Sequence, residues 1–269
     1  MNSEKNTIKS KLNFSVGKAF YYSFIAIVTW QFFGGIVSIP SLFYAPLNNI
    51  LLPLGFLVGT ISAICLLLAL TKTKISLILE AIKTPFSAIQ LILAVCCWFF
   101  FLPLAELCTS LIPTDGLLEE LYKSFEKTFN MMLNYKIAGF ITICILAPIF
   151  EEILFRGIIL KGMLNHNVKA SVAIFISGLI FGLAHMNPWQ FIGAGILGII
   201  FGFIYYRTNS LFLTMFLHFL NNTLSYVLML IYGDTEENVF LSNNHVIIGI
   251  MTILGILSLF TLYKNTKKQ

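Results

Sequence analysis

The chain alternates long apolar runs with short polar segments. A helix that crosses a bilayer needs about 20 apolar residues. Eight runs approach or exceed this length: 19–39, 48–70, 86–112, 137–160, 170–186, 190–206, 211–232 and 245–263. The fifth and sixth runs are short, so we expect their ends to be buried in protein rather than in lipid. The pattern predicts an all-α polytopic membrane protein with about eight transmembrane helices.

The composition excludes a soluble globular domain. Hydrophobic residues make up 58% of the 269 residues and charged residues only 11%, whereas soluble domains are about half apolar and a quarter charged. The richness in Ile, Leu, Phe, Asn and Lys is typical of AT-rich bacteria. We therefore expect a multi-pass protein of a bacterial cell (plasma) membrane that contacts the lipid bilayer and binds no nucleic acid.

Charged residues between the apolar runs orient the chain. Basic residues gather in the N-terminal segment, in every second loop and in the C-terminal tail: Lys5, Lys9, Lys11, Lys18, Lys72, Lys74, Lys83, Lys161, Lys169, Arg207, Lys264, Lys267 and Lys268. The alternate loops lack this excess, because 40–47 has no charge, 113–136 holds four acids and three lysines, and 233–244 holds three acids and no base. Cytoplasmic loops carry the excess of Lys and Arg. The alternation therefore predicts eight spans with both termini in the cytoplasm.

The loop before the fourth run contains a helical pattern. Apolar residues recur there at three- and four-residue steps: Leu117, Leu118, Leu121, Tyr122, Phe125, Phe129 and Met132. This spacing predicts an amphipathic helix that lies on the outer membrane surface or extends the fourth span. Two roles fit it, a cap over the helix bundle and the handling of a substrate, and the cap fits at least as well.

Two adjacent glutamates and an arginine lie inside the fourth apolar run. Ionised side chains at membrane depth are costly and usually face a protein interior or a water-filled cavity. Glu152 and Arg156 are four residues apart, so they share a helix face in the favourable acid-first order. Glu151 points about 100° away and has no cation at helical spacing, which suits a general base. A purely structural cluster is the alternative, and it fits Glu152 and Arg156 better than Glu151.

A second polar site, His185, lies near the end of the fifth run. Phe181 lies one turn before it on the same helix face. Gly178 and Gly182 are also four residues apart, a pattern of small residues that permits close approach of two helices. A lone histidine is usually a packed or interfacial residue, but two further polar sites in the apolar runs favour a functional role here.

The third polar site is in the seventh run, where His218 and Asn222 are four residues apart and can project into one cavity. Together they offer N–H donors aimed at a single point, as an oxyanion hole requires. Asn221 lies on a neighbouring face, so we expect it to form a hydrogen bond between helices.

A zinc site of Glu151, His185 and His218 is a minority alternative, since two histidines and a glutamate are zinc ligands. The helical His-Glu-x-x-His signature is absent from the sequence, and Asn222 is a poor zinc ligand. The five cysteines show no metal-type spacing. We therefore expect a site without a metal or other cofactor.

The three motifs resemble those of the CPBP family, the CAAX-protease and bacteriocin-processing (Abi) membrane proteins. In chain order they are Glu151-Glu152-x-x-x-Arg156, Phe181-x-x-x-His185 and His218-x-x-x-Asn222. The segment 205–211 is also similar to that family's link between the last two motifs. The resemblance covers about 137–230. It divides the chain into helices 1–3 with the amphipathic segment (1–136), a catalytic core of helices 4–7 (137–232), and the last helix with a basic tail (233–269).

The resemblance implies a glutamate-dependent intramembrane endopeptidase. Glu151 would be the base, and His185 would help it to hold the attacking water. His218 and Asn222 would stabilise the oxyanion. The supporting residues would be Glu152, Arg156 and Phe181. Members of the family have been described as metalloproteases, but the mechanism suggested by its eukaryotic branch is metal-independent.

Three functions fit the sequence. The first is cleavage of a membrane-tethered peptide or protein near the bilayer, such as a prenylated protein, a peptide pheromone or a bacteriocin precursor; bacteriocin immunity is compatible with it, whereas bacteria generally lack prenylation. The second is a non-catalytic membrane immunity or scaffold protein that keeps the polar cluster for helix packing or partner binding. A proton-coupled transporter would also use buried carboxylates and histidines, but no inverted repeat with paired broken helices is apparent.

The depths of the two histidines conflict with a single site. At about 1.5 Å of rise per residue, His218 lies roughly 10 Å from the cytoplasmic end of its run, and His185 lies more than 20 Å from that of its own. A shared site requires tilted or irregular helices, or a different start of the fifth helix. His218 and the basic loops favour a site that opens toward the cytoplasm.

Overall fold

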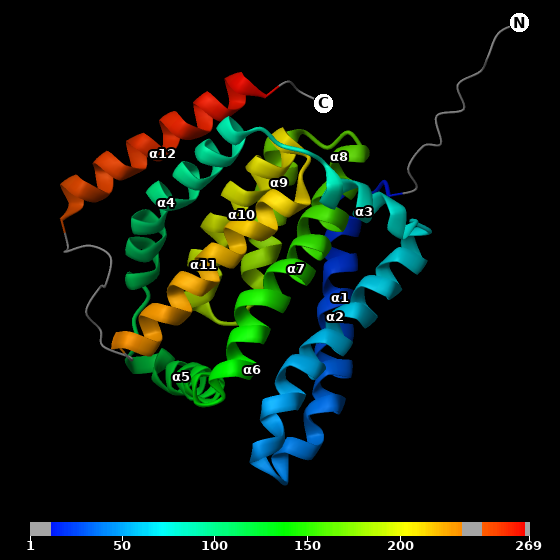
Figure 1. Ribbon diagram of the computed structural model, residues 1–269, viewed down its shortest axis with the longest axis vertical. Helices are drawn as coiled ribbons and strands as arrows, with labels where there is room; N and C mark the ends of the chain where they lie inside the picture. Colours follow the sequence, from blue (N-terminus) through cyan, green and yellow to red (C-terminus); the bar gives the residue numbers. More distant parts are fainter. Residues whose placement is uncertain (1–11, 233–243, 267–269) are drawn as a thin grey trace, which may run out of the picture.

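The computed structural model describes residues 12–232 and 244–266, and every regular element in these ranges is helical (Figure 1). The helices are α1 (Val16–Ser38), α2 (Asn48–Thr71), α3 (Ile75–Lys83), α4 (Ala88–Ser110), α5 (Glu119–Asn134), α6 (Lys136–Phe140), α7 (Ala147–Glu152), α8 (Lys161–Asn165), α9 (Ala170–Leu183), α10 (Pro188–Thr208), α11 (Leu211–Tyr232) and α12 (His245–Asn265). Short 3₁₀ turns occur at Ile39–Leu42, Ala45–Leu47 and Gly116–Leu118. The predicted all-α membrane architecture is confirmed.

Seven helices within the described ranges are long and apolar enough to cross a bilayer. The fifth predicted span is shorter, because α9 has 14 residues, or about 21 Å at 1.5 Å per residue, against a hydrocarbon core of about 30 Å. The expectation of a short sixth span is wrong, since α10 has 21 residues. Several charges used to orient the chain lie outside the described residues: Lys5, Lys9, Lys11, Asp234, Glu236, Glu237, Lys267 and Lys268.

The helices α6, α7 and α8 form one continuous span over 136–165, joined by π-helical stretches at Ile141–Leu146 and Ile153–Leu160. Such stretches are frequent at functional sites. In the first stretch the N–H of Ala147 donates to the carbonyl of Thr142, five residues back. Residue 148 is a proline, which has no N–H. The carbonyl of Ile143 therefore lacks the backbone donors that lie four and five residues ahead of it.

The basic loops lie at one end of the bundle. The N–H of Phe14 donates to the carbonyl of Gly162 in α8 (3.1 Å), and Arg207 near the end of α10 donates to the hydroxyl of Thr266 (2.8 Å). The first and last described residues therefore share an end with the loops after α8 and α10 (Figure 1). This arrangement agrees with an even number of crossings, and the side of the membrane that this end faces stays a prediction.

The short helix α3 packs at the basic end and is missing from the predicted elements, because its nine residues are too few for a span. Ile78 of α3 and Leu211 at the start of α11 both lie beside Gly157. A Cβ added to Gly157 would be 3.3 Å from Ile78 Cδ1 and 3.1 Å from Leu211 Cδ1. The first residue of α11 thus lies beside Gly157, deeper in the bundle than the end of α8.

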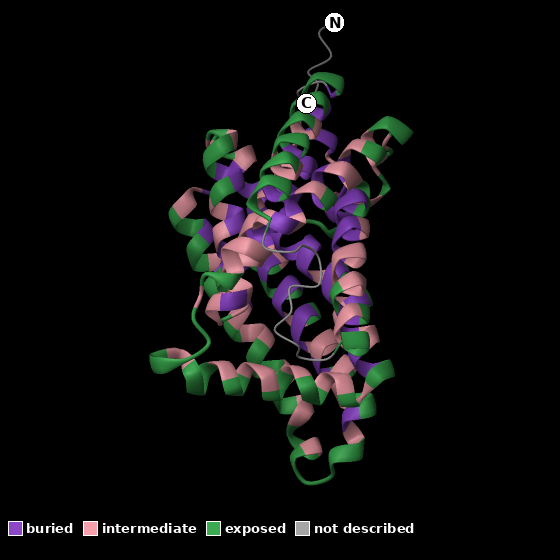
Figure 2. Ribbon diagram, turned by 90° about the vertical axis from the view of Figure 1, so that its left-hand side faces the viewer, coloured by how far each residue is buried: buried purple, intermediate pink, exposed green. Residues whose placement is uncertain are grey.

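The amphipathic helix predicted before the fourth span is α5. It lies across the end of the bundle opposite the basic loops, at a steep angle to the spanning helices (Figure 2). Phe125 stacks on Trp189 at the start of α10 (6.0 Å between ring centroids), and Tyr122 meets the same ring edge-on (4.9 Å). On the exposed face Lys123 pairs with Glu119 (2.7 Å). The helix therefore covers the end of the bundle and does not extend the fourth span.

Glycines bring α9 and α10 into close contact. A Cβ added to Gly178 would lie 2.8 Å from the backbone nitrogen of Ile199, and one added to Gly182 would lie 2.5 Å from the carbonyl oxygen of Phe191. Real Cβ atoms are not found this close to backbone atoms, so larger residues would push the helices apart. The predicted close approach at these two glycines is confirmed.

Candidate active site

Glu152 and Arg156 form a buried ion pair across one turn of the fourth span. Arg156 Nη1 donates to Glu152 Oε1 at 2.8 Å, and neither side chain is exposed. Arg156 Nη2 donates to the carbonyl of Gly198 in α10 (3.2 Å). Its guanidinium carbon also lies 4.3 Å from the centre of the Phe181 ring in α9, a cation–π contact that is stronger when desolvated. The predicted pair is confirmed, and Arg156 joins its helix to both α9 and α10.

His218 connects this ion pair to Glu151. Its Nδ1 lies 3.0 Å from Glu152 Oε1, and its Nε2 lies 3.9 Å from Glu151 Oε2. Because a carboxylate paired with Arg156 only accepts hydrogen bonds, Nδ1 of His218 is the donor. Nε2 is then the ring nitrogen that faces Glu151 and the cavity. The four side chains form a continuous polar chain from Arg156 through Glu152 and His218 to Glu151.

The depth conflict between the two histidines is resolved by the start of α11. Leu211, the first residue of α11, lies beside Gly157. Gly157 is about 12 Å along its helix from Asn165, the last residue of α8. His218 is about 10 Å along α11 from Leu211. The sum of about 22 Å places His218 near the level of Glu152, about 20 Å from the end of α8. The fifth helix begins at Ala170, as its apolar run predicts. The position at which the seventh helix, α11, starts therefore explains how both histidines reach one site.

His185 lies just beyond the last turn of α9, and its ring is held by the preceding aromatic residue. Its Nδ1 donates to the carbonyl of Phe181 (2.9 Å), so Nε2 is free to accept a hydrogen bond. The Phe181 ring meets the rings of both His185 (5.1 Å) and His218 (5.6 Å) edge-on. Phe181 therefore touches all three predicted motifs. Of the two histidines, His218 and not His185 makes ion-pair contacts with Glu151 and Glu152 in the described structure.

The two asparagines of α11 make different contacts. Asn221 accepts from the indole N–H of Trp98 in α4 (3.2 Å), which confirms the predicted hydrogen bond between helices. Asn222 Nδ2 donates to the carbonyl of Ile143 (2.9 Å), the group that the π-helical stretch and Pro148 leave without its backbone donors. One N–H of the Asn222 amide is thus engaged, and the second is the one that can serve a substrate.

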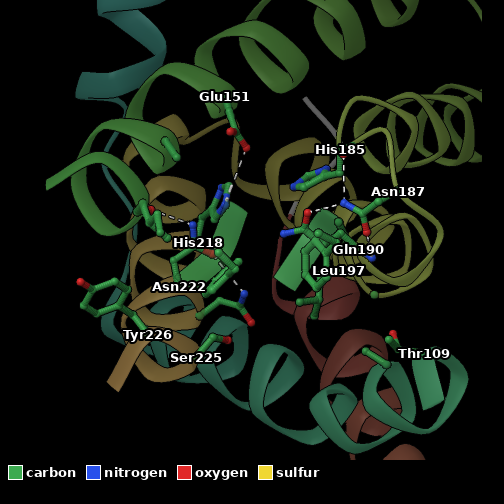
Figure 3. Close-up of a pocket in the computed structure, with 18 of the residues that line it drawn as sticks. Thr109, Glu151, His185, Asn187, Gln190, Leu197, His218, Asn222, Ser225 and Tyr226 are labelled. Carbon is green, nitrogen blue, oxygen red and sulfur yellow. Dashed lines mark hydrogen bonds and ion pairs between the residues drawn. The ribbon is translucent and has the colours of Figure 1, made fainter. Parts of the chain in front are cut away.

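The three motifs line one cavity of about 870 Å³ (Figure 3), within the usual range for ligand sites. Glu151, His185, His218 and Asn222 all border it. Its walls continue over α10 and reach α4 and α5, with Glu106, Thr109, Ser124, Phe125 and Thr128 among the lining residues. The cavity extends toward the end covered by α5. The expected opening toward the basic end is wrong, because buried residues of α3 and α11 fill that end.

The zinc alternative does not fit this arrangement. In the described part of the chain, no group of three or more His, Cys, Asp or Glu side chains is placed to hold a metal ion. The proposed set of Glu151, His185 and His218 lines one cavity without converging on one point.

Two comparisons with known proteins agree with the motifs. Residues 133–224 match the family of type II CAAX prenyl endopeptidases, Rce1-like. The chain is also 35% identical over 86 residues to YdiL, a candidate membrane peptidase of Bacillus subtilis (strain 168). This alignment covers 32% of this chain and 35% of YdiL. The alignment thus spans about a third of the curated relative. No solved structure matches the chain.

These matches confirm the resemblance to the CPBP family. The family match covers the segment that contains all three motifs, together with the π-helical stretches and the link from α10 to α11. Residues 133–224 are therefore similar in sequence to Rce1-like CAAX prenyl endopeptidases, and polar side chains of this segment line one cavity.

Three features of the site are absent from the predictions made from the sequence. Trp98 and the carbonyl of Ile143 bind the two asparagines, and Glu106 in α4 borders the same cavity. Trp98 and Ile143 carry no local signal, since an apolar run does not reveal which backbone group is unpaired. Glu106 did carry one, because it is the only charged residue in its helix.

Proposed function

We propose that this protein is a glutamate-dependent membrane endopeptidase, and that Glu151 is its general base. The observation that carries the proposal is the position of Glu151 at the cavity wall, with Nε2 of His218 3.9 Å away and the buried Glu152–Arg156 pair behind that histidine. Burial of a carboxylate without a cation of its own is costly. A proton-accepting role in a cavity that admits water accounts for its presence.

The chemistry follows from the positions of these groups. A water molecule between Glu151 and Nε2 of His185 would give a proton to the Glu151 carboxylate while its oxygen bonds to the carbonyl carbon of the substrate. The negative charge that develops on the carbonyl oxygen would be stabilised by N–H groups of His218 and Asn222. Glu151 would then return the proton to the amide nitrogen as the C–N bond breaks.

The donor groups impose conditions on this scheme. His218 gives its Nδ1–H to Glu152, so its contact with the oxyanion requires a second proton on Nε2. Asn222 gives one N–H to Ile143, so the other serves the oxyanion. Glu152 and Arg156 would hold His218 in place, and Phe181 would fix the orientation of both imidazole rings.

The substrate that we propose is a peptide or protein held at the membrane. The matching family consists of CAAX prenyl endopeptidases, and the relative in Bacillus subtilis is named as a membrane peptidase. Both names point to peptide-bond hydrolysis at a bilayer. Maturation of a pheromone or bacteriocin precursor, and immunity through proteolysis, are the physiological roles that this chemistry would serve in a bacterial plasma membrane.

The test is the replacement Glu151→Gln, which keeps the shape of the side chain and removes the base. Membrane-associated peptides from cells with the wild-type or variant protein would be compared by mass spectrometry, and purified proteins would be assayed on the peptides that accumulate. We expect cleavage to fall by at least about a hundredfold, as for the loss of a general base. The matched control is Glu120→Gln, on the exposed face of α5. Full activity of Glu151→Gln, at normal expression, would contradict the mechanism and favour a scaffold or immunity role.

A further inference from the structure

The cavity contains a second carboxylate that the proposed mechanism does not use. Glu106 is the only charged residue among the 23 residues of α4, and it is half-buried. It borders the same cavity as Glu151. An ionisable residue within a span is by default a functional candidate, because its burial has a free-energy cost that packing alone does not recover.

The described residues around Glu106 include no lysine or arginine. The described part of the chain gives it no ion pair and no hydrogen bond. None of the described residues that line the cavity is a lysine or an arginine. At the start of α10, the Asn187 amide donates to Gln190 Oε1 and accepts from the Gln190 backbone N–H.

The orientation of α4 turns this carboxylate toward the interior of the protein. Thr109 lies three residues after Glu106 on the same helix face. Its Oγ1 lies 3.5 Å from the carbonyl oxygen of Trp189 in α10, and a Cβ added to Gly193 would come within 3.1 Å of it. This face of α4 thus packs on α10 beside the cavity, and Glu106 belongs to the cavity wall rather than to the lipid-facing surface.

The cavity that both carboxylates border also has apolar lining residues. Leu102, Ala105, Ala194, Leu197 and Leu224 line it. A ligand that contacts both the apolar wall and Glu106 therefore has an apolar part and a cationic group. A free carboxylate in partly desolvated surroundings binds a cation much more strongly than it would in water.

We propose that Glu106 is a specificity-determining residue that binds the positively charged side chain of a lysine or arginine in the peptide substrate. This inference rests on the proposed endopeptidase function and adds a substrate class to it: peptides in which apolar residues flank the scissile bond and a basic residue lies at a fixed distance from it. Glu106 binds the peptide and takes no part in the chemical step.

Binding is measured separately from cleavage. The probe is a fluorescent, N-acetylated 12-residue peptide of leucine, alanine and serine with one lysine, placed at each position in turn, and its matched set has norleucine instead of lysine. Acetylation removes the terminal amine as a competing cation. Affinity is measured for the Glu151→Gln protein in lipid nanodiscs, so that no peptide is hydrolysed.

We expect the best lysine peptide to bind about tenfold more tightly than its norleucine counterpart, as for a charged hydrogen bond. Adding Glu106→Gln brings the ratio close to one, Glu106→Asp retains a preference for lysine, and Glu106→Lys shifts the preference to a glutamate peptide. Adding Glu120→Gln, on the exposed face of α5, leaves the tenfold ratio in place.

Three results would overturn the assignment of Glu106. They are an absence of lysine preference at every position, a preference that survives Glu106→Gln, and equal losses for both peptides, which indicate a structural role. Failure of the endopeptidase proposal would give a different result. In that case the Glu151-containing protein binds lysine peptides selectively through Glu106 and cleaves none of them.

Discussion

Nδ1 of His218 lies 3.0 Å from Oε1 of Glu152, the same oxygen atom that accepts a hydrogen bond from Arg156. One carboxylate oxygen thus serves both a guanidinium and an imidazole. The second oxygen, Oε2, is buried without a hydrogen-bond partner in the described structure. Glu152 therefore acts as the anchor for a histidine that comes from a helix 66 residues further along the chain.

Replacing Glu152 and replacing Glu151 should have different consequences. Glu152→Gln leaves Arg156 as a buried, uncompensated charge, which costs about 3–5 kcal/mol, and it also releases His218. We expect a lower unfolding temperature and lost activity. Glu151→Gln should lose activity at nearly normal stability. The measurement is thermal unfolding in detergent, followed by tryptophan fluorescence. An unchanged unfolding temperature for Glu152→Gln would show that the pair does not stabilise the bundle.

Replacing Asn221 should mainly lower stability, and replacing Asn222 should mainly lower activity. Asn221→Ala removes the acceptor of the Trp98 indole, which costs about 1 kcal/mol, and Trp98→Phe in the same background should add little, because the two share one bond. Asn222→Ala should lower kcat by about 10²–10³-fold, as for the loss of an oxyanion donor. Unfolding and steady-state kinetics on all variants check this. Comparable kcat values for the two asparagine variants would remove the oxyanion role from Asn222.

The contact between α9 and α10 should tolerate no larger residue. Gly178→Ala places a Cβ 2.8 Å from the backbone nitrogen of Ile199, so the helices must separate, at a cost of about 1–3 kcal/mol. Gly35→Ala in α1 is the matched control, since nothing lies within 4 Å of its added Cβ, and it should change stability little or raise it slightly. Unfolding in mixed detergent micelles compares the two. Equal stability of both variants would contradict the close packing.

Metal removal should leave the activity intact. The described residues provide no cluster of three metal ligands, and the proposed chemistry uses side chains alone. We expect peptide cleavage to survive dialysis against EDTA and 1,10-phenanthroline, with metal content followed by mass spectrometry. Loss of cleavage that one equivalent of zinc restores would instead support the site of Glu151, His185 and His218.

Much of the site was predictable because helix geometry is local. Spacing of four residues placed Glu152 beside Arg156 and Phe181 beside His185, and the structure contains both contacts. The hydrogen-bonding role expected for Asn221 also holds. The partner of His218 was not predictable, since no periodicity within α11 reports which residue of another helix faces it.

The amino-acid sequence was enough to predict the membrane class, most of the helical spans and the three polar motifs. The cost of burying charge in lipid confines such polar residues to protein interiors. The alternation of basic loops predicted the order of crossings, because cytoplasmic loops carry the excess of Lys and Arg. The way in which the motifs meet follows from the packing of the helices. The start of α11 beside Gly157 sets the depth of His218, and α3 and α5 set the end toward which the cavity extends. These features depend on packing between distant segments, which the pattern of apolar and polar residues within one helix does not encode.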